Sequence, residues 1–255
     1  MTVASLVLHM FPASHYNEKA RWALDWKGLA HQRVSHLPGP HLLSIRRLSG
    51  QVQTPVLSMD GRVIPGSAPI IDALERAFPA RPLYPEDPAQ REQALSVQRH
   101  FDAEVGPAVR TVIFSALILE PDFLCATFAR TQPRWQRALY RAAYPLLKGP
   151  IASGNGVNPT NVERSFARTE LALDETARML GPSGQLVGSG FSVADLTVAA
   201  LLAPLVSLSH PDMARPRPVP ARVLELSARF EKHAAVQWVR EQYAKHRPAS
   251  CAVSA

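Results

Sequence analysis

Two hydrophobic periods alternate along the first eighty residues. Short apolar or alternating runs have the period of a strand, and apolar positions three and four residues apart have the period of a helix. The segments predicted as strands are 6–11, 32–37, 56–59 and 62–64. The segments predicted as helices are 17–28, 41–48 and 67–78. This part of the chain is therefore expected to be mixed α and β.

Turn residues separate these segments. Gly28 can stop the first helix, and Pro38-Gly39-Pro40 forces a turn before the second. Asp60-Gly61 suits a type I′ turn, so the last two strands are expected to form a hairpin. The resulting order, β-α-β-α-β-β-α, is the thioredoxin pattern.

The pattern changes after a proline-rich segment at 81–88, which has the composition of an interdomain linker. Beyond it no further strand is expected. Helical periodicity covers 90–119, 133–147, 162–180, 192–206 and 223–245, with loops at 151–161 and 210–220. The predicted division is a thioredoxin-like domain at 1–80, a linker at 81–89, an all-helical domain at 90–247 and a disordered tail at 248–255.

Composition, net charge and cysteine content limit the classes of protein to which the chain can belong. The chain has 255 residues, 46% hydrophobic and 19% charged, as expected for a globular protein. Its net charge of +7 is spread out rather than gathered in a basic block, so no nucleic-acid partner is expected. Cys125 and Cys251 form no CxxC pair, which favours a reducing, cytoplasmic location. Neither a membrane-inserted segment nor a signal peptide is expected.

Two short motifs carry chemistry. Ser14-His15-Tyr16-Asn17 stands at a strand-to-helix turn, where a hydroxyl lies beside free backbone N–H groups that suit an anion such as a thiolate. Thr54-Pro55 opens a strand, where a cis bond would expose a backbone edge to a ligand. Together they predict a domain that handles a thiol compound.

The matching stretches LVLHMFPASHYNEKARWALD, GQVQTPVLSMDGRVIPGSAPIIDALE, RPLYPEDP and LVGSGFSVADLTVAALL resemble, in order, the cytosolic glutathione transferase superfamily. The last contains a capping box, Ser192 to Asp195. The resemblance implies an N-terminal domain that binds glutathione, a helical domain that receives a small apolar electrophile, and a homodimer. A weaker similarity over PGPHLLSIRRLSGQVQTPVL points to the β-etherase-like branch without assigning a substrate.

By this resemblance Ser14 takes the catalytic position and would donate to the glutathione sulfur. A serine cannot form the mixed disulfides of cysteine-type relatives, so conjugation or non-catalytic binding is favoured. The alternative for Ser14 is a plain helix N-cap. Met10 falls where other relatives have a catalytic tyrosine; it cannot donate and is kept as a possible pocket residue. Tyr16 could substitute or only rim the pocket, and His15 could pair with the thiolate or simply be solvated.

The resemblance also implies the glutathione-binding residues. Thr54-Pro55 would hydrogen-bond the cysteinyl backbone, and Ser67 would take the γ-glutamyl carboxylate at a helix start or serve only as an N-cap. Gly66 stands where relatives have an acidic residue, which puts glutathione affinity in question. His41 and Gln53 match positions that contact the glycine carboxylate and nearby polar groups, and His41 could instead be a surface residue after a turn.

The helical domain supplies further pocket candidates. Arg110 follows Pro107 in a helix that the proline would kink, and it either faces the cleft or lies exposed. Phe101, Phe114 and Trp135 line the pocket or belong to the core. No histidine spacing suits a metal. The sequence thus predicts a glutathione transferase, with a non-catalytic binding or regulatory protein of the same fold as the alternative.

Overall fold

The computed structural model describes residues 5–253. Its N-terminal part contains β1 (Leu6–Met10), α1 (His15–Trp26), β2 (His31–Ser35), α2 (His41–Ser49), β3 (Val56–Met59), β4 (Arg62–Pro65) and α3 (Ser67–Ala77). This is the predicted thioredoxin-like order. The strands form one sheet in the order β4-β3-β1-β2-β5, in which β1 is parallel to β2 and antiparallel to β3.

The predicted hairpin is present. β3 and β4 pair in antiparallel register, with Met59 opposite Arg62. The turn residues Asp60 and Gly61 both have positive φ, 49° and 81°, as a type I′ turn requires. The hairpin sets the position of residues just before it, including the cis Thr54–Pro55 bond.

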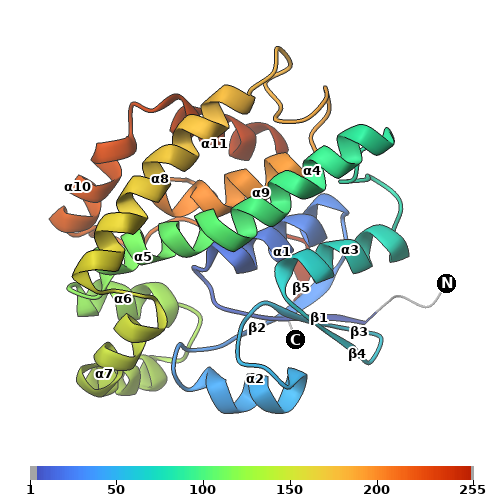
Figure 1. Cartoon of the computed structure of the whole chain (residues 1–255). Helices are drawn as coiled ribbons and strands as arrows, with labels where there is room; N and C mark the ends of the chain where they lie inside the picture. Colours follow the sequence, from blue (N-terminus) through green and yellow to red (C-terminus); the bar gives the residue numbers. More distant parts are fainter. Residues whose placement is uncertain (1–4, 254–255) are drawn as a thin grey trace.

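The C-terminal part is helical. Its elements are α4 (Pro88–His100), the π-helical segment η1 (Phe101–Val105), α5 (Gly106–Leu117), α6 (Pro121–Phe128), α7 (Arg134–Gly154), α8 (Pro159–Met179), α9 (Val193–Leu202), the 3-10 turn η2 (Ala203–Leu205), α10 (Ala221–Phe230) and α11 (Ala234–His246). α1 packs between the sheet and α9, which lies next to α4 and α5, whereas α2 covers the other face of the sheet (Figure 1).

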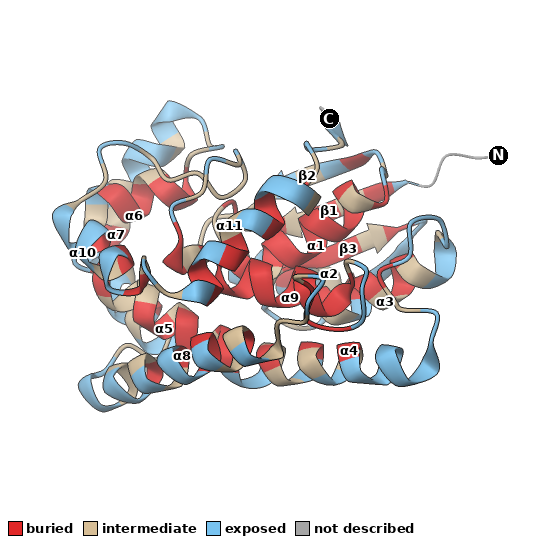
Figure 2. Ribbon diagram, turned by 90° about the horizontal axis from the view of Figure 1, so that it is seen from above, coloured by how far each residue is buried: buried red, intermediate tan, exposed pale blue. Residues whose placement is uncertain are grey.

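Burial follows this arrangement. Figure 2 shows buried residues concentrated in α1, α9 and the sheet beside them. All ten residues of α9 are buried, and the helix starts with the predicted capping box, in which Asp195 accepts from the Ser192 N–H. One core therefore runs from the sheet through α1 into the helical domain. Among residues 5–253, no helix has the length and apolar character needed to cross a bilayer.

Several helix boundaries differ from the sequence prediction. The segment 90–119 is interrupted by η1, and 223–245 is two helices separated by a turn at 231–233. α6 was not predicted, and α7 continues past Pro145 and Pro150 into a segment predicted as a loop. A proline inside a helix removes one backbone hydrogen bond but does not forbid the helix when the rest of it is supported.

The π-helical segment has a clear cause in the sequence. Gly106 N–H donates to Phe101 O, a step of five residues, so it does not use the carbonyl of Asp102. The next residue is Pro107, which has no N–H to offer that carbonyl. The Asp102 carbonyl is therefore free to accept a hydrogen bond from another element. The Tyr16 hydroxyl donates to it at 2.6 Å.

The prediction of a disordered tail at 248–255 is wrong for residues 248–253. Residues Ala252–Val253 form β5, parallel to β2, and the Cys251 N–H donates to Asp25 at 2.7 Å. The preceding Arg247 is buried among carboxylates of α1. Buried polar partners thus hold this segment against the sheet; residues 254–255 lie outside the described part of the chain.

Candidate functional site

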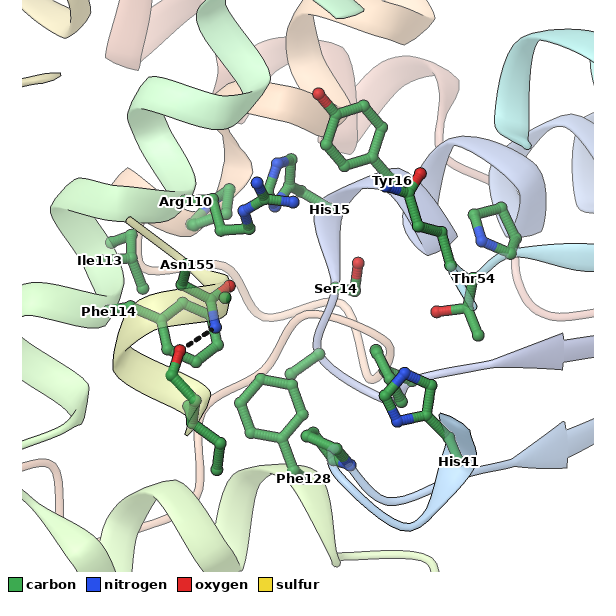
Figure 3. Close-up of a pocket in the computed structure, with 18 of the residues that line it drawn as sticks. Ser14, His15, Tyr16, His41, Thr54, Arg110, Ile113, Phe114, Phe128 and Asn155 are labelled. Atoms are coloured by element: carbon green, nitrogen blue, oxygen red, sulfur yellow. Dashed lines mark hydrogen bonds between the residues drawn. The ribbon is translucent and has the colours of Figure 1, made fainter. Parts of the chain in front are cut away.

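A cavity of about 1230 Å³ opens between the two parts of the protein. Its walls come from the loop before α1, the segment 50–55, the start of α3, and helices α5, α6 and α7 (Figure 3). The predicted site residues that line it are Ser14, His15, Tyr16, His41, Gln53, Thr54, Pro55, Gly66, Ser67, Arg110 and Phe114. The structure therefore brings most of the sequence candidates to one place.

Ser14 is the N-cap of α1. Its backbone is extended and its carbonyl accepts from Glu18 N–H at 2.9 Å, but its side chain makes no capping hydrogen bond. In Figure 3 the hydroxyl points into the cavity. The first N–H groups of a helix have no partner within it, so the hydroxyl stands at the positive end of α1. The Ser14 side chain therefore does not act as a helix cap in the structure.

His15 is buried, contrary to the prediction of a solvated side chain. Its Nε2 lies 3.1 Å from the Gly106 carbonyl, which fixes the ring against the start of α5. Burial, aided by the nearby Arg110 guanidinium, lowers the pKa of His15 to about 3. The imidazole is therefore neutral at pH 7 and brings no positive charge to the site.

Tyr16 rims the cavity and holds the domains together. Its hydroxyl donates to the Asp102 carbonyl, and burial raises its pKa well above the usual range. Gly106 is required here, because a Cβ at that position would lie 2.6 Å from the Tyr16 ring carbon that carries the hydroxyl. Since a phenol has one proton to donate and Asp102 receives it, the Tyr16 hydroxyl has no proton to offer a ligand in the cavity.

Thr54 connects the segment before β3 to α1. Its Oγ1 accepts from Asn17 Nδ2 at 3.1 Å, and Asn17 is fully buried. Pro55 O accepts from Gly66 N–H at 2.9 Å, which ties the same segment to the start of α3. The next residue upstream, Gln53, is exposed and hydrogen-bonds on both sides of its backbone to the Gln51 side chain. The backbone of residues 53–55 thus lines the cavity between the starts of α1 and α3.

The N-cap of α3 is Gly66, not Ser67. Gly66 has φ 94° and ψ 145°, a region that essentially only glycine adopts. Ser67 is the first helical residue and is buried at the cavity wall. A side chain at position 66, including the acidic one expected from the resemblance, would be strained in this conformation.

His41 begins α2 on the opposite side of the cavity. Its Nδ1 accepts from Gly39 N–H at 3.1 Å, and its ring meets Phe11 edge to face at 4.7 Å between centroids. Burial lowers the pKa of His41, so the neutral ring has its proton on Nε2.

The far end of the cavity is apolar. Ile113 and Phe114 of α5 face Phe128 of α6 across it (Figure 3). The aromatic rings of Phe114 and Phe128 lie 5.8 Å apart, and Phe128 also meets Phe11 at 6.3 Å. This chamber suits a small apolar molecule placed next to Ser14.

Three sequence candidates lie elsewhere. Met10 points from β1 into the core, where alternation places Leu6 and Leu8 as well, and its sulfur contacts Arg21 at 3.3 Å. Phe101 is fully buried in the main core. Trp135 is 65% exposed on α7. The pocket interpretation is wrong for Met10 and Phe101, and both alternatives, pocket and core, are wrong for Trp135.

Sequence reasoning missed several lining residues. They are Phe11, Ile113, Phe128, Leu147 and Asn155. Phe128 on α6 had a readable signal, since Pro121 opens a run with apolar residues at 123, 124 and 128, of which 124 and 128 share one helical face. No group of three or more His, Cys, Asp or Glu residues within 5–253 is arranged to hold a metal ion.

Comparison with known proteins agrees with this geometry. The family model described as glutathione S-transferase, N-terminal domain, matches residues 8–82. The chain therefore carries an N-terminal domain of the glutathione S-transferase type at residues 8–82. Its N-terminal domain is shown by that match, and the glutathione S-transferase fold of the whole chain by solved structures. No curated protein sequence matches it at a significant level.

Three solved structures illustrate the shared fold. Beta-etherase LigF from Sphingobium sp. strain SYK-6 has 21% identity and a TM-score of 0.61, with 93% of this chain and 99% of that chain covered. A glutathione S-transferase from Methylobacterium radiotolerans JCM 2831, in complex with glutathione sulfonate, has 21% identity and a TM-score of 0.54, with 98% of each chain covered. The theta class enzyme from Xanthomonas axonopodis pv. citri, with glutathione bound, has 16% identity and a TM-score of 0.56, with 92% and 97% covered.

Proposed function

We propose that this protein binds glutathione, ionises its thiol beside Ser14 and directs the thiolate at a small, mainly apolar electrophile. The observation that carries the proposal is the position of the Ser14 hydroxyl. It stands at the positive end of α1, in a cavity that continues into an apolar chamber. Two relatives of this fold are solved with glutathione or its sulfonate.

The tripeptide would lie along the backbone of residues 53–55, between the starts of α1 and α3. The γ-glutamyl carboxylate would accept from the free N–H groups at Ser67 and Ala68, the positive end of α3. The cysteinyl backbone would pair with the main chain at Thr54, next to Pro55, and Gln53 and His41 would lie toward the glycine end. This placement leaves the sulfur beside Ser14.

Ser14 is the donor best suited to the sulfur. The His15 imidazole is neutral and bonded to Gly106, and the Tyr16 hydroxyl donates to Asp102. A hydrogen bond to a charged group contributes about 1.5–3 kcal/mol, which corresponds to about 1–2 units of thiol pKa. That shift is enough to make much of the bound thiol a thiolate at pH 7.

The reaction would be addition, displacement or, in a third possibility, ether cleavage. In displacement the sulfur forms a bond to an electrophilic carbon, and the leaving group departs with the bonding electron pair. The chain contributes position and a lowered thiol pKa rather than an acid or base of its own. A serine at the sulfur position favours this chemistry over disulfide exchange.

A second candidate function is non-catalytic binding or regulation by a protein that kept the fold. Gly66 favours it, because no acidic side chain stands there to meet the ligand's ammonium group. Calorimetry with glutathione, followed by a conjugation assay with a chloronitrobenzene, separates the two. Binding and turnover support the enzyme, binding without turnover supports the binding protein, and no binding refutes both assignments to glutathione.

The proposal includes a homodimer in a reducing, cytoplasmic compartment. Family resemblance supports the dimer, and the absence of any disulfide among the described residues suits the compartment, since Cys125 and Cys251 are free. Sedimentation of the purified protein tests the dimer, and a monomer at micromolar concentration would contradict it.

A further inference from the structure

Charged side chains in the cavity wall are few, and one of them has no protein partner. The charged lining residues are Asp102, Arg46, Arg110 and Arg215. Asp102 is neutralised by Lys19, whose Nζ lies 2.6 and 2.7 Å from its two oxygens. Arg215 is bonded to Ser227 Oγ at 2.8 Å and to the Pro204 carbonyl at 2.7 Å. Both groups therefore have protein partners, although those of Arg215 are neutral hydrogen-bond acceptors.

Arg110 differs from both. It is half-buried, its Nε is buried without an acceptor, and within residues 5–253 it takes part in no ion pair. Arg46 is exposed on α2, where water can solvate it. Among the described residues, Arg110 is therefore the wall cation that is partly removed from water with neither an ion pair nor a hydrogen bond to the protein, a situation that favours an anionic ligand.

The position of Arg110 says where that anion would be. Residues 110, 113 and 114 share one face of α5, so the guanidinium stands one helical turn before the apolar side chains of the chamber. Figure 3 shows it extending toward His15 and the space in front of Ser14. In the same view Thr54, beside which the glutathione backbone would be bound, lies on the other side of Ser14.

We propose that Arg110 is a specificity-determining residue that selects electrophiles with an anionic substituent, such as an aromatic carboxylate, on an otherwise apolar body. The inference rests on the proposed function for the identity of the chamber as the co-substrate site. The planar guanidinium pairs with a carboxylate through two hydrogen bonds. The ring of the ligand would pack against Phe114 and Phe128.

The test compares matched acidic and neutral ligands. Meta-nitrobenzoate and meta-nitrobenzamide differ in charge but hardly in shape, and neither reacts with a thiol. Calorimetry at pH 7 without glutathione is expected to show about tenfold or more tighter binding of the acid, because only the acid can form a charge-assisted pair with Arg110. Arg110→Met should abolish that preference, Arg110→Lys should retain part of it, and the exposed Arg47→Met should leave it unchanged.

A second readout follows the reaction. Para-chloro-meta-nitrobenzoate and its carboxamide both accept a thiolate at the carbon that loses chloride, so kcat/KM for the acid should fall selectively in Arg110→Met. Equal binding of acid and amide by the wild type, or a preference that survives Arg110→Met, would overturn the proposal. So would an equal loss of glutathione affinity, because the guanidinium would then serve the tripeptide. Selective binding of the acid without any turnover would support the anion site while refuting the enzyme.

Discussion

Arg247 Nε donates to Glu18 Oε1 at 2.7 Å, and both side chains are completely buried. The same guanidinium reaches Asp25 at 2.8 Å and Asp212 at 2.7 Å. One arginine after α11 thus ties the C-terminal segment to α1, the helix that begins at Ser14. The carboxylates hold the pKa of Arg247 above its usual range, and Arg247 and Arg21 hold that of Glu18 below its usual range against the opposing effect of burial.

Removing this arginine should destabilise the fold strongly. Arg247→Ala leaves buried carboxylates without their partner, a loss of about 3–5 kcal/mol. Urea unfolding measures it. Lys245→Ala, two residues earlier, removes an exposed pair with Glu241 and should change the unfolding free energy by less than about 1 kcal/mol. Equal effects of the two variants would show that the C-terminal segment is not anchored as described.

Gly66 should resist any side chain. Gly66→Ala is expected to lose about 1–3 kcal/mol, because its φ of 94° is strained for a residue with a Cβ. Gly190→Ala is the matched control, since Gly190 has no positive φ and a Cβ there would meet nothing within 4 Å. Gly66→Asp should therefore lower stability without improving glutathione affinity. A gain in affinity with unchanged stability would refute this explanation of the missing acid.

The bond between Asn17 and Thr54 should stabilise the segment that crosses the cavity. Asn17 is fully buried and its Oδ1 already has no partner, so Thr54→Val would leave its Nδ2 without an acceptor as well. We expect a loss of about 1–3 kcal/mol in thermal or urea unfolding. Thr54→Ser keeps the acceptor and should stay near the wild type. If both variants unfold alike, the hydrogen bond does not support this segment.

His15 should make stability depend on pH. Its pKa falls from an ordinary 6.5 in the unfolded chain to about 3 in the fold. Between these values the unfolded state binds the extra proton, so the contribution is fully present above pH 6.5 and is lost as pH falls toward 3. The unfolding free energy should therefore fall from pH 7 to pH 5. His15→Gln, which can still donate to Gly106, should show a smaller slope, and an unchanged slope would contradict the assignment.

The sequence predicted the elements whose signals are local. The β-α-β-α-β-β-α order follows from the hydrophobic period and the turn residues. Asp60 and Gly61 form the type I′ turn that these residue types favour. Ser14, Thr54 and Ser67 could be brought to one cavity because family resemblance places them at the ends of adjacent elements. Their ligand roles are still predictions.

What the sequence did not predict depends on contacts between distant residues. The tail is ordered through Arg247 and Cys251, which bind α1 carboxylates more than two hundred residues away. His15 is buried against the Gly106 carbonyl, which lies ninety-one residues further along the chain. Met10 was misplaced although strand alternation alone, with Leu6 and Leu8 inward, would have turned it to the core. Helix α6 has only 8 residues, so its hydrophobic periodicity is a weak signal.

The most direct test of the account is the pKa of the glutathione thiol in the complex, followed by the ultraviolet absorbance of the thiolate across pH. The wild type should ionise bound glutathione about 1–2 units below the free tripeptide, and Ser14→Ala should return most of that shift while glutathione still binds. A bound thiol that titrates like the free one, or a shift that survives Ser14→Ala, would contradict the role assigned to Ser14.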